Sequence, residues 1–184
     1  GKSTLVSDLA KYFYTDCSVE FGKEDMVFNA KLETKLDVND YLSFLKNQYE
    51  LTLNKINSSR FVFFGDTDNL VTLMYAKYYA GDNDFDLSYD DYFVIEEASK
   101  KYNFLYKWDK IFLLKPHNKF VDDGIRYMKH SDMKIRMEMF NILCNFLKEF
   151  GLWDRVTILD GNYYDNFCEV VNYTRGVINE EVFK

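Results

Sequence analysis

The chain begins with Gly1-Lys2-Ser3-Thr4, and the prediction of its fold starts from this stretch. The four residues match the second half of the phosphate-binding motif G-x-x-x-x-G-K-[ST], in which backbone N–H groups surround a polyphosphate and the lysine reaches its outer phosphates. The strand and the first glycine of that motif would precede Gly1, so we expect the sequence to begin inside the loop. On its own, the tetrapeptide is also compatible with a solvated helix start.

The residues behind this stretch have the spacing of an amphipathic helix. Apolar side chains recur three and four positions apart, at Leu5, Val6, Leu9, Tyr12 and Phe13. The phosphate-binding motif requires a helix at this point, because the N–H groups of its first turn attract anions. The sequence therefore predicts a phosphate site at the start of the chain.

The composition indicates one globular domain over residues 1–184. With 47% hydrophobic residues the chain can bury one substantial core, and no repeat or linker divides it. The formal net charge of -7 argues against a nucleic-acid-binding domain, which normally presents a basic face to phosphates. A small anionic ligand stays compatible with this charge, because a local cluster of donors can oppose it.

Three widely spaced cysteines, Cys17, Cys144 and Cys168, contain no C-x-x-C pair. We therefore expect neither a disulfide framework nor a zinc site, which fits a reducing cytoplasm. No apolar run approaches the roughly 18 residues that span a bilayer, and no signal-peptide pattern precedes the first helix. The expectation is a cytoplasmic protein that does not associate with membranes.

Short apolar segments alternate with longer amphipathic segments along the rest of the chain. Helices are expected at 37–56 with Asp37 as N-cap, at 70–80, 92–102 and 133–150, and from Phe167 to Ile178. Strands are expected at 17–21, 61–65, 111–114 and 156–159. This alternation predicts an α/β three-layer sandwich with a mainly parallel sheet of the P-loop kinase type, whose first strand would precede Gly1.

Two of these segments carry more detailed expectations. The run from Phe61 to Gly65 is continuously apolar, as in a strand buried on both faces. The helix over 133–150 is expected to bury the face formed by Met133, Met137, Phe140, Cys144 and Leu147. An acidic loop over 82–86 superficially resembles a calcium loop. It has Leu87 where the motif needs glycine, so we expect a solvated loop instead.

Carboxylates follow two of the predicted strands. Glu20 lies at the end of the strand over 17–21, and Asp66 follows the strand over 61–65. Because ligands bind at the carboxyl ends of parallel strands, both side chains are expected to meet the Gly1–Thr4 stretch. An aspartate after a strand is otherwise often a turn former or a helix cap. With the phosphate motif upstream, we interpret Asp66 as a metal or substrate ligand.

The predicted site has the parts that phosphoryl transfer needs. In a phosphate-binding loop Lys2 supplies charge to the β- and γ-phosphates of ATP, Ser3 supplies a hydroxyl to Mg²⁺, and the N–H groups from Gly1 to Thr4 bind anions. Asp66 would complete the magnesium site. Glu20, Asp66 and Asp68 could each bind sugar hydroxyls or take a proton from one, and the sequence does not separate these roles.

A polar hinge over 129–132 lies between Arg126 and Arg136. Phosphoryl transfer needs positive charge near the migrating group and exclusion of water, and a lid segment that carries arginine commonly supplies both. We therefore predict a lid over about 118–136. His117 and His130 have no partner at metal-ligand spacing and are interpreted as solvated loop residues.

Four elements occur in an order that one family shares: GKSTL at 1–5, Glu20-Phe21-Gly22-Lys23, an aspartate pair in Phe64-Gly65-Asp66-Thr67-Asp68, and Asp123-Gly124-Ile125-Arg126. Over essentially its whole length, the chain resembles the ribosylnicotinamide kinase domain of the NadR-type NAD-biosynthesis proteins. The resemblance implies a P-loop kinase fold and ATP-dependent phosphorylation of the ribose 5′-hydroxyl of ribosylnicotinamide to nicotinamide mononucleotide. It departs at Lys23, where arginine is commoner, and Arg136 matches only loosely.

The resemblance also implies roles for individual residues. The expected ATP and Mg²⁺ contacts are Gly1, Lys2, Ser3, Thr4, Arg126 and Arg136, with Ser3 and Asp66 on the metal. The expected substrate contacts are Glu20, Asp66, Asp68 and Asp123, and the expected catalytic residues are Lys2, Glu20, Asp66 and Arg126.

Two alternatives stay open. The domain could be a nucleotide-sensing regulatory module that binds ATP or NAD-related ligands without turnover, or a kinase for another nucleoside. The family often carries an N-terminal adenylyltransferase domain and sometimes a DNA-binding module, and neither lies within these residues. The expected partner is a small-molecule nucleoside, and the sequence leaves open whether the chain forms a homo-oligomer.

Overall fold

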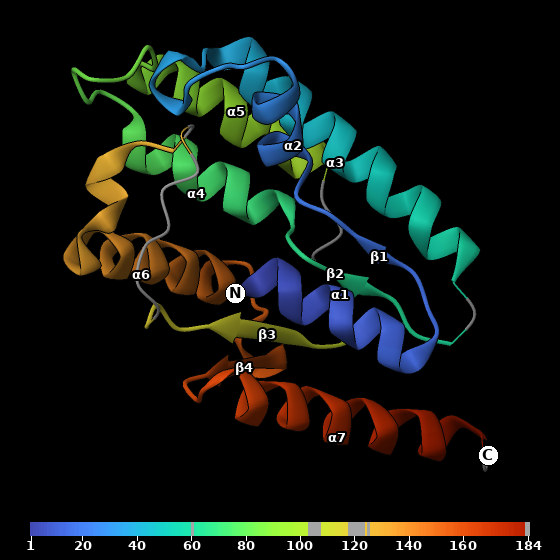
Figure 1. Ribbon diagram of the computed structural model, residues 1–184. Helices are drawn as coiled ribbons and strands as arrows, with labels where there is room; N and C mark the ends of the chain where they lie inside the picture. Colours follow the sequence, from blue (N-terminus) through green and yellow to red (C-terminus); the bar gives the residue numbers. More distant parts are fainter. Residues whose placement is uncertain (60, 103–107, 118–123, 125, 183–184) are drawn as a thin grey trace.

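Short parallel strands lie between layers of helices in the computed structural model (Figure 1). The structure describes residues 1–184 except 60, 103–107, 118–123, 125 and 183–184. Strand β1 (Cys17–Ser18) pairs in parallel with β2 (Phe64–Gly65), and β3 (Ile111–Leu114) pairs in parallel with β4 (Val156–Leu159). The predicted α/β class with parallel strands is confirmed. In the described part of the chain, the strands form two pairs and not one continuous sheet.

Apart from α2, which was not predicted, the helices follow the periodicity of the sequence. They are α1 (Lys2–Phe13), α2 (Phe21–Phe28), α3 (Val38–Ser58), α4 (Asn69–Tyr79), α5 (Tyr89–Lys101), α6 (Met133–Glu149) and α7 (Tyr163–Val182). Short 3-10 helices are η1 (Glu33–Lys35), η3 (Met128–Ser131) and η4 (Trp153–Arg155). Asp37 caps α3 as predicted, in a capping box with Asp40.

Two apolar cores hold these elements together. The larger core joins α3, α4, α5 and α6, which pack against one another on one side of the strands (Figure 1). The smaller core joins Leu5 and Leu9 of α1 to Leu159 of β4 and to Val170 and Val171 of α7. Helix α1 contacts β1, β2 and α7, so the start of the chain is fixed between the two strand pairs.

The predicted strands around the site are shorter than expected. The segment from Phe61 to Phe63 lies outside β2, and Phe61 is 80% exposed, so the prediction of a strand buried on both faces is wrong there. β1 provides only two paired residues, which limits the ladder that β2 can form. The strand predicted over 17–21 ends at Ser18, and Phe21 already begins α2.

The buried face of α6 also differs from the prediction. Cys144 and Leu147 are buried as expected, but Met139 and Phe146 take the other buried positions and Met133 is 40% exposed. The buried residues all lie in the second and third thirds of the helix. That portion therefore packs most closely against the core, while in the first turn Met133 and Lys134 are exposed and Ile135 is half-buried against it.

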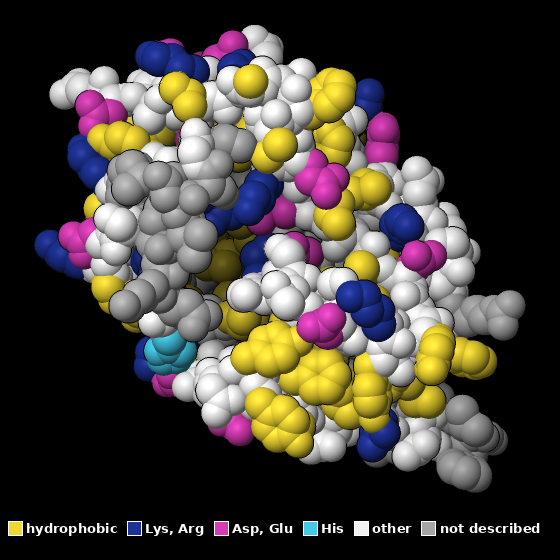
Figure 2. Space-filling model, in the orientation of Figure 1, with side chains coloured by type: hydrophobic (Ala, Val, Ile, Leu, Met, Phe, Trp, Pro, Cys, Tyr) yellow, Lys and Arg dark blue, Asp and Glu magenta, His cyan; other side chains and the backbone are white. Residues whose placement is uncertain are grey.

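Outside the strands and cores, the surface shows an acidic loop and a patch of exposed hydrophobic side chains. The acidic loop after α4 is solvated as predicted, with Asp84 and Asp86 exposed and Phe85 buried against Tyr79. Within the described ranges, each helix is too short or too polar to cross a bilayer. Hydrophobic side chains gather on the surface over α1 and α7 (Figure 2), where the exposed rings include Tyr12 and Tyr164.

Candidate functional site

Lys2, Glu20 and Asp66 converge at the start of α1. The Lys2 ammonium lies 2.7 Å from Asp66 Oδ1 and 3.2 Å from Glu20 Oε2. The Asp66 side chain is only 3% exposed, whereas the Lys2 side chain is 38% exposed. The meeting of the two carboxylates with the Gly1–Thr4 stretch, expected from the sequence, is observed.

The ends of the β1–β2 pair position these carboxylates. Asp66 is the first residue after β2, and its backbone N–H donates to the carbonyl of Ser18 at 3.1 Å, which continues the parallel ladder by one bond. Glu20 stands between β1 and α2 with extended backbone, as the N-cap residue of that helix. Each carboxylate therefore projects from the carboxyl end of its strand toward α1.

A buried glutamine fixes the turn that carries Glu20. Gln48 of α3 is 4% exposed and accepts a hydrogen bond from the backbone N–H of Phe21 at 2.8 Å. It also donates to the carbonyl of Val19 at 3.1 Å. Gln48 thus replaces the hydrogen bonds that the chain loses between β1 and α2.

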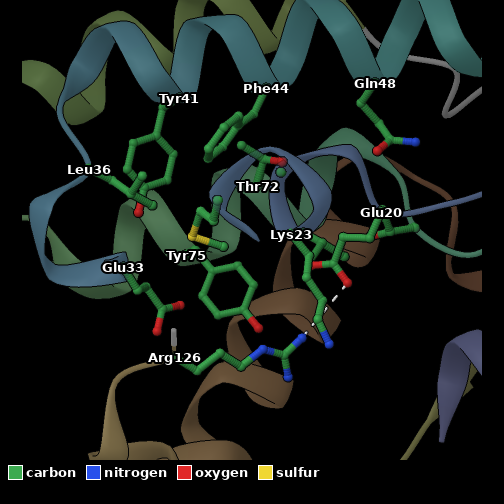
Figure 3. A pocket seen from close by; sticks show the side chains of 14 residues that line it. Glu20, Lys23, Glu33, Leu36, Tyr41, Phe44, Gln48, Thr72, Tyr75 and Arg126 are labelled. Carbon is green, nitrogen blue, oxygen red and sulfur yellow. Dashed lines mark ion pairs between the residues drawn. The ribbon is translucent and has the colours of Figure 1, made fainter. Parts of the chain in front are cut away.

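A pocket that is open to solvent lies next to Glu20. The guanidinium of Arg126 reaches into it, with Nη2 4.0 Å from Glu20 Oε2 (Figure 3). Figure 2 shows side chains of both charges together in a hollow at the centre of this face. The lining residues are Glu20, Gly22, Lys23, Met26, Glu33, Leu36, Tyr41, Phe44, Gln48, Thr67, Val71, Thr72, Tyr75 and Arg126.

The pocket combines rings with polar groups. Tyr41, Phe44 and Tyr75 supply aromatic surface, while Glu20 and Arg126 supply charge at one end (Figure 3). Aromatic faces with a few converging polar groups suit a flat, partly polar small molecule. The pocket can therefore hold a ring system against its aromatic wall and a hydroxylated or charged portion near Glu20.

Most of these lining residues were missed in the sequence. Gln48 carries the clearest signal, because it falls in the apolar stripe of a predicted helix, between buried Leu45 and Thr52. Thr67 follows Asp66, which was predicted to bind metal or substrate. Its hydroxyl oxygen is buried and lacks a hydrogen-bond partner among the described residues, so a polar group on a ligand could satisfy it.

Asp68 takes a structural position. Its Oδ1 accepts from the backbone N–H of Leu70 at 3.1 Å, which makes it the N-cap of α4, and its Oδ2 accepts from Trp108 Nε1 at 2.9 Å. Burial raises the pKa of Asp68, and the hydrogen bonds from Trp108, Leu70 and Asn69 offset this in part. Asp68 does not line the pocket, so a contact with substrate stays a prediction.

The remaining predicted residues are placed less fully. Ser3 and Thr4 are exposed in the first turn of α1, and Arg136 is half-buried on α6. Asp123 lies outside the described residues, and so does part of the predicted lid. The described part of the lid consists of Gly124 and residues 126–136, which include η3 and the start of α6. The lid and its ATP contacts therefore stay predictions.

The donors at the start of α1 fit a nucleotide with Mg²⁺. The exposed Ser3 hydroxyl and the Asp66 carboxylate are oxygen ligands, which Mg²⁺ prefers, and Lys2 provides charge for phosphates. Among the described residues, no cluster of three or more His, Cys, Asp and Glu could hold a metal by itself. A magnesium ion here would thus take most of its ligands from phosphates and water, as is usual at nucleotide sites.

A helix that begins at GKST, a carboxylate buried after a parallel strand, and a pocket beside both define a P-loop nucleotide-binding domain. The profile of a family described as an AAA domain matches residues 1–165, and the chain belongs to that family.

The names of two curated relatives refer to NAD biosynthesis. The chain is 28% identical to the trifunctional NAD biosynthesis/regulator protein NadR of Escherichia coli (strain K12) and, at the same identity, to that of Salmonella typhimurium. Each match covers 98% of this chain and 41% of the relative. The chain thus spans less than half the length of the curated relatives it matches.

Solved structures agree with these relatives. A crystal structure of NadR in complex with NR matches with a TM-score of 0.79 and 30% identity, over 95% of this chain and 48% of that one. A crystal structure of NadR with NAD and AMP-PNP matches with a TM-score of 0.73 and 27% identity, over 95% and 46%. The resemblance to NadR is confirmed, and so is the P-loop kinase type of fold.

Proposed function

We propose that the domain over residues 1–184 is an ATP-dependent nucleoside kinase that phosphorylates the ribose 5′-hydroxyl of ribosylnicotinamide to nicotinamide mononucleotide. The observation that carries the proposal is the convergence of Asp66 and Glu20 on Lys2, together with the aromatic pocket that Glu20 also lines. The similarity to NadR structures with NR and with AMP-PNP supports the two substrates.

In this proposal the start of α1 binds ATP. The N–H groups from Gly1 to Thr4 and the Lys2 ammonium hold the β- and γ-phosphates, and Ser3 and Asp66 hold Mg²⁺. Bound Mg²⁺ would neutralise part of the charge on the phosphates. Arg126 and, from α6, Arg136 would add positive charge near the migrating phosphoryl group.

The acceptor would lie in the pocket with its ribose toward Glu20. Glu20 lines the pocket and Asp66 does not, so we assign the contact with the 5′-hydroxyl to Glu20 and the contact with the nucleotide side to Asp66. Glu20 then orients the hydroxyl and receives its proton as the oxygen attacks the γ-phosphorus, while the bond from the γ-phosphorus to the β,γ-bridging oxygen breaks and ADP leaves. Asp68 and Asp123 would support the substrate from neighbouring segments.

The setting of the enzyme is part of the proposal. A cytoplasmic location fits the free cysteines Cys17, Cys144 and Cys168. In the full protein, an adenylyltransferase domain or a DNA-binding module could accompany the kinase, since the name of the NadR relative combines biosynthesis with regulation.

The test measures ATP consumption by the full-length protein with ribosylnicotinamide, uridine, cytidine and deoxynucleosides as acceptors. We expect turnover that is fastest with ribosylnicotinamide. Faster turnover with another acceptor would reassign the substrate. Tight ATP binding without turnover on any acceptor would contradict the kinase and favour the nucleotide-sensing regulatory module.

A further inference from the structure

The residue after Arg126, Tyr127, is hydrogen-bonded through its backbone to the wall of the pocket that Arg126 enters. The backbone N–H of Tyr127 donates to Glu33 Oε2 at 2.7 Å. Glu33 belongs to η1, 94 residues earlier in the chain, and it lines the same pocket as Arg126. The hydrogen bond therefore links the pocket wall directly to the backbone beside Arg126. Figure 3 shows the Glu33 and Arg126 side chains at this pocket.

The side chain of Tyr127 is anchored as well. Its hydroxyl donates to Asp84 Oδ2, which also accepts from Lys129 at 2.8 Å. Its ring stands edge-on to Phe85, with centroids 5.2 Å apart and planes at 83°. Because Phe85 is itself buried against Tyr79, these contacts fix Tyr127 to the loop between α4 and α5.

Glu33 is an unusual residue at this place. It is 5% exposed, and a buried carboxylate is costly unless it is hydrogen-bonded or paired. Its charge lies close enough to Tyr41 and Tyr79 to raise the pKa of each phenol, after burial as the larger cause. An apolar side chain would fill this space at lower cost, so the buried carboxylate of Glu33 indicates a specific role.

We propose that Glu33 is a positioning residue, which holds the backbone at Tyr127 and thereby keeps the Arg126 guanidinium over the acceptor pocket beside Glu20. Charge-assisted hydrogen bonds of a carboxylate to a backbone N–H are short and directional, so they suit this task. The inference rests on the proposed kinase function for its consequence on activity. The contact itself does not depend on that function.

The first test measures hydrogen exchange at the Tyr127 amide without any substrate. Glu33→Ala removes the acceptor, and we expect exchange at Tyr127 to rise by about tenfold or more. Glu33→Gln keeps an amide oxygen as acceptor and should restore most of the protection. An unchanged rate in Glu33→Ala, or a rise of equal size in Glu33→Gln, would overturn the positioning role.

The second test is a double-mutant cycle on kcat/KM in the full-length protein with ATP and ribosylnicotinamide. Glu33→Ala and Arg126→Ala should each lower kcat/KM by about tenfold or more, and the double variant should be no slower than Arg126→Ala alone. Losses that multiply would mean that Glu33 acts independently of Arg126 and would overturn the proposal. Asp86→Asn is the control, because Asp86 is an exposed acid in the loop between α4 and α5. This variant should leave kcat/KM unchanged.

The two tests separate the failure of this inference from the failure of the proposed function. No turnover in the unmodified protein would contradict the kinase function, while the exchange test would still decide the role of Glu33 at Tyr127. Normal turnover of the unmodified protein, with losses in kcat/KM that multiply in the double variant, would support the kinase function and contradict the positioning role of Glu33.

Discussion

Lys2 Nζ lies 2.7 Å from Asp66 Oδ1, and this ion pair joins the first residue of α1 to the end of β2. The lysine side chain is partly open to solvent whereas the carboxylate is buried, so a phosphate can approach the ammonium from outside while Asp66 fixes it from within. In the proposed function, the phosphates of ATP would therefore approach Lys2 from the solvent side.

The first prediction concerns the two members of this pair. Lys2→Ala and Asp66→Asn should each lower kcat by roughly 10²-fold or more, because each removes charge stabilisation at the transferring group. Steady-state kinetics on the full-length protein measure the loss, and circular dichroism confirms that the variants are folded. Lys11→Ala, at an exposed lysine of the same helix, should retain full activity. Wild-type activity in Asp66→Asn would contradict its role.

The second prediction concerns the glutamine that shapes the turn at Glu20. Gln48→Leu leaves the N–H of Phe21 and the carbonyl of Val19 without their partner, which should lower the free energy of unfolding by about 1–3 kcal/mol. Because Glu20 lies between those two residues, KM for the nucleoside should also rise. Urea denaturation and kinetics test both effects.

Asn47→Ala is the matched control for this prediction. It removes an exposed hydrogen bond to Ser43 from the neighbouring position of α3. Little change in stability or KM is expected for this variant. An equal loss in both variants would mean that Gln48 contributes only as part of the helix.

The sequence predicted the elements of the fold better than the site. The helix that begins at Lys2 and the cap at Asp37 were predictable, because apolar periodicity and capping chemistry are local. The convergence of Glu20 and Asp66 was predictable too, since parallel strands end at the same edge. Strand lengths were not, because the extent of β2 depends on how many residues β1 offers.

The pocket itself was largely hidden from sequence analysis. Glu33 lies on a three-residue 3-10 helix without a motif, and its partner Tyr127 is 94 residues away. Both sides contact the loop between α4 and α5, Tyr127 through Asp84 and η1 through the ion pair of Lys35 with Asp86, so tertiary contacts bring the two together. Asp68 differs from Glu33, because it belongs to a motif that is recognisable in the sequence. In the structure it is the N-cap of α4, and its second oxygen accepts a hydrogen bond from Trp108.

The third prediction compares two glycines. A Cβ at Gly65 would lie 2.8 Å from the Trp108 ring, so Gly65→Ala should lower the free energy of unfolding by about 1–3 kcal/mol. Gly176 is exposed within α7, with no described atom within 4 Å of an added Cβ, and Gly176→Ala should raise it by roughly 0.5–1 kcal/mol. Equilibrium unfolding in urea measures both. An unchanged or higher free energy of unfolding in Gly65→Ala would disprove the close approach of Trp108 to β2.

The fourth prediction concerns the pH dependence of stability at two helix caps. Burial raises the pKa of Asp68 above its ordinary value of 3.8, so the native state holds this proton more tightly than the unfolded chain does. The contribution of Asp68 to stability therefore falls as pH rises from 3.8 through the folded pKa, and it is level above that. Asp68→Asn keeps a capping oxygen but does not titrate.

Asp91, in the capping box of α5, supplies the opposite case, because hydrogen bonds from Ser88 lower its pKa below 3.8. Its contribution is present above 3.8 and is lost as pH falls through the folded pKa. Urea denaturation across this range should show Asp68→Asn gaining stability relative to the parent as pH rises above 3.8, and Asp91→Asn approaching the parent as pH falls below it. A difference between Asp68→Asn and the parent that does not vary with pH would show that Asp68 has the same pKa in the folded and the unfolded protein, and would contradict the raised pKa.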